Sequence, residues 1–192
     1  MALTFFLNIN DISTDEYNRE PDFLCDRKLK KIGNMRSQED KKRSLAANLA
    51  ARRTAACFLG LDENDIRIYH DETGRPLCDG CFISLSHSGN YVACAVNRSP
   101  VGIDIEHIRD LNLKLSDKIC RTDEERDFAD CSEKLLEIWT VKEACFKALS
   151  PKYKTVGEIE LKITERGFFL EGISFIETGK VHRDYLFSLA AV

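Results

Sequence analysis

Two similar apolar segments divide this chain of 192 residues into halves. Tyr91-Val-Ala-Cys-Ala-Val96 ends the first half, and a second apolar segment that begins with tyrosine, residues 185–192, ends the chain. Each segment closes a stretch in which a long helical pattern is followed by strand patterns. We therefore predict an α+β fold of two similar halves, residues 1–98 and 99–192. Each half would be a long helix packed on a small, mostly antiparallel sheet, with a pseudo-twofold axis relating the two.

The long helices have clear ends in the sequence. Ser37 and Asp40 predict the start of the first helix, and Gly60 predicts its end. The second long helix should run from Ser132 to Leu149, before a Ser-Pro pair, and Thr122 with Glu125 predicts a shorter helix before it. Strands are expected at 3–9, 66–69, 82–85, 91–96, 101–106, 157–163, 167–170, 173–177 and 184–192.

Charge and hydrophobic patterning exclude two classes of partner. The chain has 28 Lys and Arg against 32 Asp and Glu, a net charge of -4, which argues against binding nucleic acid through bulk charge. Nothing in the sequence approaches the roughly 20 apolar residues that span a bilayer, and the apolar N-terminus lacks a basic leader. We expect a cytoplasmic protein that binds neither nucleic acid nor membrane.

Cysteines are numerous, but they do not form a recognisable disulfide or metal framework. Eight are present, and only Cys78-Asp-Gly-Cys81 has the spacing of a zinc-ligand pair. A second pair that would complete a four-ligand set is missing. A loop with two free thiols, a structural zinc site and a redox-active pair therefore remain open.

The segment Val101-Gly-Ile-Asp-Ile-Glu106 alternates strictly between apolar and other residues. In a strand, Gly102, Asp104 and Glu106 share one face, and the two carboxylates lie about 6.6–6.8 Å apart along it. Such a pair can hold a hard cation such as Mg²⁺, and the glycine leaves room for something to approach the backbone. The alternative is a half-buried strand with a solvated acidic face.

A second concentration of functional residue types lies within the helix expected at 132–149. Trp139, Lys142, Glu143, Phe146 and Lys147 occupy about a 140° arc of a helix. The arc mixes two aromatic anchors with two lysines and a carboxylate, which is unusual for an amphipathic helix. We interpret Lys142 as a stem packed at the core edge whose ammonium group points toward a site. A simple Glu143–Lys147 helix pair remains open.

Two further groups of residues in the first half have the chemistry of phosphate binding. Gly74-Arg-Pro76 and Ser84-Leu-Ser-His-Ser-Gly89 combine turns with hydroxyls, a histidine and a cation. A basic group precedes them, composed of Lys28, Lys31 and Arg43 with Ser44. A plain turn and a solvated basic face are the alternative readings. A serine hydrolase is disfavoured because the Gly-x-Ser-x-Gly elbow is missing.

Together and in this order, these segments resemble the 4′-phosphopantetheinyl transferases of the larger type with two halves. The resemblance covers roughly residues 28–150. Its most specific parts are Val-Gly-Ile-Asp-Ile-Glu at 101–106 and Trp-x-x-Lys-Glu-Ala-x-x-Lys at 139–147. The chain is shorter than many members, and Glu124 and Glu125 compete for one further acidic position, whose role stays unassigned.

The resemblance implies a role for each residue that matches the family pattern. Asp104, Glu106 and Glu143 would hold Mg²⁺ or Mn²⁺, with Glu143 and Lys147 as catalytic residues and Glu143 or a metal-bound water as the base. Residues that would contact coenzyme A are Lys28, Lys31, Arg43, Ser44, Arg75, Ser86, His87, Lys142 and Lys147.

The resemblance also implies a reaction and its partners. The phosphopantetheine arm of coenzyme A would pass to a serine of an apo acyl or peptidyl carrier protein, releasing adenosine 3′,5′-bisphosphate. We expect a monomer, because two joined halves already supply each other's partner. Another Mg²⁺-dependent phosphoester enzyme and a binding domain without catalysis remain alternatives.

Overall fold

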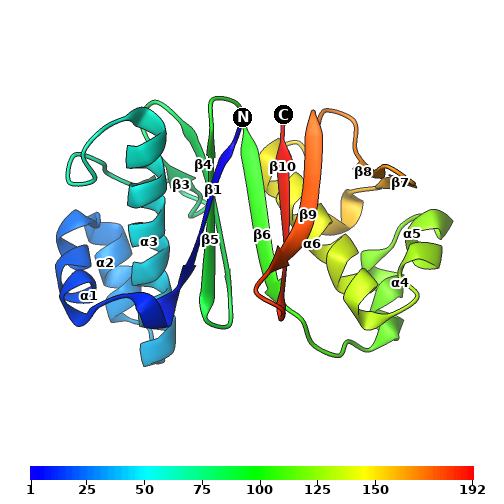
Figure 1. Cartoon of the computed structure of the whole chain (residues 1–192), viewed down its shortest axis with the longest axis horizontal. Coiled ribbons are helices and arrows are strands. Elements are labelled where there is room, and N and C mark those ends of the chain that lie inside the picture. The colour runs from blue at the N-terminus through cyan, green and yellow to red at the C-terminus, as the bar shows by residue number, and fades with distance from the viewer. The chain divides into compact units, whose positions relative to one another are not determined.

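A computed structural model describes all residues, 1–192. The chain folds into two compact units. The units are Met1–Ser99 and Pro100–Val192, and their boundary lies one residue beyond the position expected from the sequence. Each unit combines helices with antiparallel strands, which confirms the predicted α+β class (Figure 1). No helix is long and apolar enough to cross a membrane.

In the first unit, a long helix covers one face of a three-stranded sheet (Figure 1). The helices are α1 (Thr14–Arg19), α2 (Asp26–Gly33) and α3 (Gln38–Leu59), with short 3₁₀ helices at Ile9–Asp11 and Glu20–Phe23. The strands are β1 (Leu3–Asn8), β2 (Tyr69–His70), β3 (Pro76–Leu77), β4 (Phe82–Ser88) and β5 (Tyr91–Asn97). Helix α3 begins at the predicted cap, where Ser37 accepts a hydrogen bond from the Asp40 N–H, and ends at Gly60, whose φ is +70°.

The second unit repeats this arrangement with a second long helix (Figure 1). Its helices are α4 (Ser116–Ile119), α5 (Asp123–Phe128) and α6 (Ser132–Leu149), with 3₁₀ helices at Leu113–Leu115 and Val156–Glu158. Its strands are β6 (Val101–His107), β7 (Lys162–Thr164), β8 (Gly167–Phe169), β9 (Phe175–Val181) and β10 (Tyr185–Ala191). Helix α6 has the predicted bounds.

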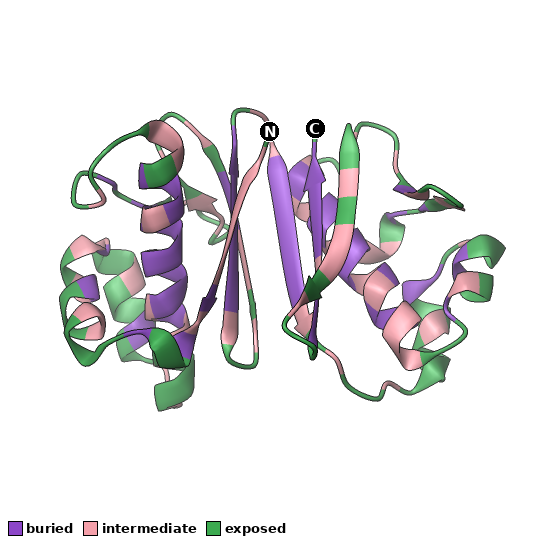
Figure 2. Ribbon diagram, viewed as in Figure 1, coloured by how far each residue is buried: buried purple, intermediate pink, exposed green.

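The two units have the same sheet topology. In the first unit, β1 pairs with the last strand β5, which in turn pairs with β4. In the second, β6 pairs with the last strand β10, which in turn pairs with β9. All four pairings are antiparallel. The last strand is central in each sheet, which explains why the two segments that end the halves are so apolar (Figure 2).

Several expected elements differ in detail. Residues 66–69 contribute only Tyr69 to a two-residue strand, and the strand expected at 82–85 extends to Ser88. The strand expected at 157–163 begins as a 3₁₀ helix, and only Lys162 and Ile163 fall in β7. The segment before Ser37 carries α1 and α2, which its polar composition concealed. These helices are six and eight residues long and contain few apolar residues, so they offer too few positions for an apolar period to show in the sequence.

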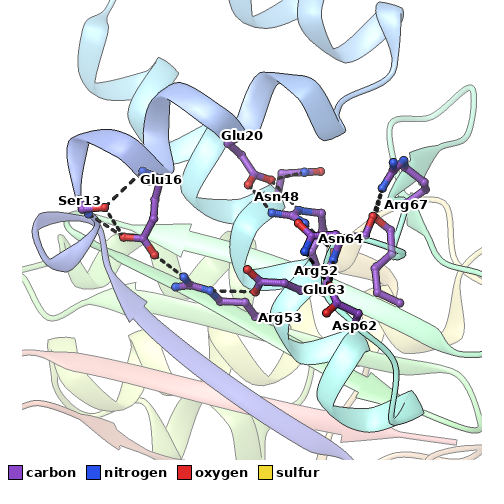
Figure 3. A network of polar contacts seen from close by, with 11 residues as sticks. Ser13, Glu16, Glu20, Asn48, Arg52, Arg53, Asp62, Glu63, Asn64 and Arg67 are labelled. Carbon is purple, nitrogen blue, oxygen red and sulfur yellow. Dashed lines mark hydrogen bonds and ion pairs between the residues drawn. The ribbon is translucent and has the colours of Figure 1, made fainter.

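A buried ion pair fixes α3 to the segment before it (Figure 3). The carboxylate of Glu20 accepts hydrogen bonds from Asn48 at 2.6 Å and from Arg52 at 2.9 and 3.2 Å. The Arg52 guanidinium also lies 3.6 Å from the centre of the Phe23 ring. Glu20 and Arg52 are only 1% and 3% exposed, so this network is internal structure that orders the helices around α3.

Candidate functional site

The acidic strand and the lysine helix of the second unit meet at a glycine. A Cβ atom on Gly102 of β6 would lie 1.9 Å from the carbonyl oxygen of Ala144 in α6. Only glycine permits this close approach, so the backbone of α6 rests directly on β6. The space that the sequence predicted beside Gly102 is therefore filled by the helix. Because Asp104 follows on the same face of β6, it lies beside Glu143 and Lys147 of α6.

Lys147 and Asp104 form the central pair of this site. The Lys147 ammonium group donates to the Asp104 carboxylate at 2.7 Å and to the Ile103 carbonyl oxygen at 3.0 Å. The Asp104 side chain is 7% exposed and that of Lys147 is 27% exposed. The pair therefore stands at an edge of the unit, where its charges are partly desolvated and retain contact with solvent.

Glu143 brings a third carboxylate into electrostatic range of this pair. Burial raises its pKa, the cation of Lys147 opposes that effect, and the negative charges of Asp104 and Glu106 raise the pKa further. Glu106 itself accepts a hydrogen bond from Arg109 at 2.8 Å. The three carboxylates predicted to hold a metal thus lie within electrostatic range of one another, on β6 and α6.

The same carboxylates have the donor chemistry of a magnesium site, although they do not form a closed set of ligands. As the side chains lie, no three His, Cys, Asp or Glu residues are grouped closely enough to hold a metal ion. Asp104 and Glu106 instead bond to cationic side chains. Hard oxygen donors that repel one another match what Mg²⁺ requires, because the cation would relieve that repulsion.

Lys142 does not point toward a ligand, and this corrects the prediction from the helix motif. Its side chain is fully buried, and its ammonium group donates to Glu125 at 2.8 Å. Its other two hydrogen bonds go to the carbonyl oxygens of Ile119 at 2.8 Å and Ile159 at 2.7 Å. All three N–H donors are used inside the unit. Lys142 therefore leaves the helix in a different direction from Lys147 and does not share its site.

Of the two glutamates that compete for the further acidic position, Glu125 is the one that the structure places inside the unit. Thr122 caps α5 as predicted, accepting from the Glu125 N–H at 3.1 Å, but the Glu125 side chain does not return to the cap. It accepts hydrogen bonds from the backbone N–H groups of Arg121 at 2.5 Å and Leu161 at 2.6 Å, besides the bond from Lys142. Glu125 is fully buried and works as an internal partner of Lys142.

In the first unit, Lys28 and Lys31 of α2 surround a residue that the sequence analysis missed. Burial is the main cause that lowers the pKa of His70 to about 4, and the positive charges of Lys28, Lys31 and Arg27 contribute to the same shift. The Nδ1 atom of His70 is buried without a hydrogen-bond partner. Burial and the neighbouring Lys31 likewise lower the pKa of Lys28. Three cations around one histidine form a place that an anion would stabilise. An isolated histidine in a short strand gave no signal of this.

Arg75 belongs to the turn that packs against the same helix. The β2–β3 turn is closed by Asp71, which accepts hydrogen bonds from the backbone of Thr73 and Arg75, both at 2.9 Å. Arg27 of α2 donates to the carbonyl oxygens of Asp71 and Glu72, both at 3.0 Å. Arg27, which the sequence analysis did not single out, thus ties the turn that carries Arg75 to the helix that carries Lys28 and Lys31.

The remaining predicted residues of the first unit lie on α3 and β4. Arg43 donates to Asp40 at 2.5 Å and to the carbonyl oxygen of Gly89, in the β4–β5 turn, at 3.5 Å. Ser44 is buried in α3, whereas Ser86 is half-buried and His87 exposed on β4. Arg43 thus lies near the end of β4, and a separate group forms around α2 and the β2–β3 turn.

One unit presents carboxylates beside a lysine, and the other presents clustered cations, a combination typical of proteins that handle phosphate groups. Two family models match the chain, "4'-phosphopantetheinyl transferase, N-terminal" over residues 12–99 and "4'-phosphopantetheinyl transferase superfamily" over residues 100–186. The chain belongs to the 4′-phosphopantetheinyl transferase superfamily.

Curated relatives agree with this membership. The 4′-phosphopantetheinyl transferase Sfp of Bacillus subtilis (strain 168) is 29% identical over 145 residues, covering 71% of this chain and 64% of the relative. The 4′-phosphopantetheinyl transferase gsp of Aneurinibacillus migulanus is 32% identical over 117 residues, covering 58% and 49%. The transferase HetI of Nostoc is 28% identical over 140 residues, covering 66% and 59%. In these alignments the chain spans between about half and two thirds of its relatives' length.

Proposed function

We propose that this chain transfers the 4′-phosphopantetheine moiety of coenzyme A to a serine hydroxyl of an apo acyl or peptidyl carrier protein. Adenosine 3′,5′-bisphosphate is the leaving product. The observation that carries the proposal is the packing of α6 on Gly102, which sets Lys147 and Glu143 beside Asp104 in a chain of this superfamily. That packing explains why the two most specific sequence motifs occur together.

In the proposed reaction, the second unit acts on the pyrophosphate of coenzyme A. The ammonium group of Lys147 neutralises negative charge that develops on the phosphate oxygens as the bond to the leaving group breaks. Its hydrogen bonds to Asp104 and to the Ile103 carbonyl oxygen hold it in position before the substrate arrives. Glu143 accepts the proton of the incoming serine hydroxyl, directly or through a water.

Asp104, Glu106 and Glu143 are the residues that would hold Mg²⁺ or Mn²⁺, which supplies charge neutralisation at the pyrophosphate when it is bound. Two features support this assignment: the hard oxygen chemistry of the three side chains, and the negative charges of Asp104 and Glu106, which add to burial in raising the pKa of Glu143. Lys142 is left out of the coenzyme A contacts, because its ammonium group is consumed by internal hydrogen bonds.

The first unit binds the nucleotide end of coenzyme A in this proposal. Lys28 and Lys31, around His70, and Arg75 offer positive charge for a phosphate monoester. Arg43, Ser44, Ser86 and His87 supply further contacts, as the family resemblance implies. The carrier protein would dock through local contacts, because a net charge of -4 does not favour attraction of an acidic partner over the whole surface. A monomer and a cytoplasmic location remain predictions from the sequence.

Intact-mass spectrometry of an apo carrier protein tests the proposal. The carrier is incubated with the chain, coenzyme A and Mg²⁺, and a parallel sample contains EDTA. We expect a Mg²⁺-dependent gain of one phosphopantetheine on the carrier serine. Asp104→Asn should abolish the gain, whereas Asp110→Asn, the same chemical change at an exposed position just beyond β6, should leave it intact.

The outcomes separate the alternatives. Cleavage of phosphodiesters with Mg²⁺, without any use of coenzyme A, would identify another phosphoester enzyme. Absence of both transfer and coenzyme A binding across several carriers would identify a binding domain without catalysis.

A further inference from the structure

The turn between β3 and β4 holds two cysteines against each other. Cys78 and Cys81 pair as an antiparallel bridge, and the Cys81 N–H donates to the Cys78 carbonyl oxygen at 3.5 Å. Gly80, with φ of +84°, provides the left-handed residue that a turn this tight requires. Facing residues of an antiparallel pair have Cα atoms about 4.5–5.5 Å apart and side chains on the same face. A disulfide needs Cα atoms about 4.4–6.8 Å apart, so the backbone is already suited to one.

The two thiols differ in chemical character. They share a hydrogen bond that lowers the pKa of Cys81, and the neighbouring Arg98 cation lowers it as well. Arg98 is held at the turn by its own hydrogen bond to the Gly80 carbonyl oxygen at 3.2 Å. The same thiol–thiol hydrogen bond, together with burial, raises the pKa of Cys78. Cys81 is therefore the thiol that ionises first, and Cys78 is the one that keeps its proton.

The surroundings of the pair favour thiol chemistry over metal binding. No further His, Cys, Asp or Glu side chains are grouped with these two cysteines closely enough to complete a metal site. Both cysteines are half-buried, whereas Cys94, Cys120 and Cys145 are buried. Cys57 and Cys131 are exposed and Cys25 is half-buried, but none of these three lies near a second cysteine in the sequence. The turn is thus the place in the chain where two thiols are accessible, adjacent and asymmetric.

We propose that Cys78 and Cys81 form a redox-active dithiol that small-molecule disulfides, such as glutathione disulfide, oxidise to an intramolecular disulfide. The Cys81 thiolate attacks one sulfur of glutathione disulfide, whose S–S bond breaks and releases one glutathione thiolate. Cys78 then loses its proton and attacks the Cys81 sulfur, which releases the second glutathione. In total, two protein thiols are oxidised and one glutathione disulfide is reduced to two glutathione molecules.

The position of this site links it to the fold of the first unit. The turn leaves β3, which follows Arg75, and enters β4, which carries Ser86 and His87. A disulfide across the turn would fix the point from which β4 starts. The proposed dithiol does not depend on the proposed transferase activity, and its test uses no coenzyme A.

The experiment is thiol mapping of the full chain in glutathione redox buffers of defined ratio. Samples are quenched with acid, free thiols are alkylated, and the peptides are identified by mass spectrometry. We expect Cys78 and Cys81 to escape alkylation together, because they are joined in one disulfide. The other six cysteines should remain free thiols and be alkylated. The proposal is overturned if residues 78 and 81 stay reduced under buffers that oxidise Cys57 or Cys131.

Variants test the asymmetry of the pair. Cys78→Ser removes the thiol that resolves the mixed disulfide, so one glutathione per chain should accumulate on Cys81. Cys81→Ser should react with glutathione disulfide more slowly than Cys78→Ser does, because burial and the nearby Asp79 still raise the pKa of the remaining Cys78 thiol, whereas the Arg98 cation lowers the pKa of Cys81. Cys57→Ser, at an exposed position outside the turn, is the matched control and should oxidise like the unchanged chain. Equal adducts on both single variants would contradict the assigned roles.

Discussion

The ammonium nitrogen of Lys142 lies 2.8 Å from a carboxylate oxygen of Glu125, and neither side chain is exposed to solvent. Lys142 comes from α6 and Glu125 from α5, and both also bond to backbone groups of the segments around residues 119–121 and 159–161. Four segments of the second unit therefore meet at one ion pair. The first unit also contains a buried ion pair beside its long helix, between Glu20 and Arg52 of α3.

Removing one member of this pair should destabilise the chain. Lys142→Met leaves the Glu125 carboxylate buried without its cation, and we expect the free energy of unfolding to fall by about 3–5 kcal/mol. The measurement is chemical denaturation followed by circular dichroism. In the double variant Lys142→Met/Glu125→Gln no unpaired charge stays buried, and the single amide oxygen can still accept one of the two backbone hydrogen bonds, from Arg121 or Leu161, so part of the loss should be recovered. Unchanged stability, with a loss of coenzyme A affinity alone, would return Lys142 to the ligand site.

Gly102→Ala tests the close approach of α6 to β6. The added methyl group would meet the Ala144 carbonyl oxygen at 1.9 Å, so the helix must shift. We expect the free energy of unfolding to fall by about 1–3 kcal/mol. A shifted helix also moves Lys147 away from Asp104, which should lower the rate of phosphopantetheine transfer. Gly33→Ala in α2 is the matched control, because a Cβ there meets nothing within 4 Å. A Gly102→Ala chain as stable as the control would contradict the packing.

The two long helices and the central strands could be predicted because their signals are local. Ser37, Gly60 and Pro151 mark helix ends by backbone chemistry that needs no knowledge of the tertiary structure. The alternation at 101–106 likewise placed Asp104 and Glu106 on one face of a strand. The roles of residues that depend on contacts between distant segments could not be predicted. Helical spacing places Lys142 on the same arc as Lys147. Only the fold shows that the ammonium group of Lys142 forms a buried ion pair with Glu125.

His70 illustrates the opposite error, in which a site residue carries no local signal. It stands alone in a two-residue strand, and its significance comes from cations that lie about 40 residues earlier in the sequence. The sequence indicates that something approaches the backbone closely at Gly102, but it does not show whether that is a ligand or a packed helix. In each case the missing information is which element packs against which.

Lys147→Met should reduce the transfer rate by about 10²–10³-fold, because a positioned charge beside the reacting phosphate is lost. Rates are measured by mass spectrometry of the carrier, and circular dichroism checks that the variant is folded. Lys134→Met is the matched control on the same helix, since Lys134 forms a surface pair with Asp130 at 2.9 Å. If both variants keep the full rate, Lys147 is only a structural partner of Asp104.

His70 should make the stability of the chain depend on pH. Burial and the cations of Lys28, Lys31 and Arg27 lower its pKa from 6.5 to about 4, while the neighbouring Asp71 opposes them. The unfolded chain therefore binds more protons than the folded chain between pH 6.5 and 4. As the pH falls through this window, the free energy of unfolding must decrease, and above pH 6.5 the effect of His70 disappears.

The measurement is urea denaturation at pH 7, 6 and 5, comparing the unchanged chain with His70→Gln. The variant should lose less stability between pH 7 and 5, because it has no imidazole to protonate. Lys31→Gln should also lose less, since it removes one of the charges that depress the pKa of His70. If an anion binds among these cations, inorganic phosphate should also reduce the loss of stability between pH 7 and 5, because it would favour the protonated histidine. A pH dependence that is identical in the unchanged chain and in both variants would mean that His70 is protonated as readily in the folded chain as in the unfolded one.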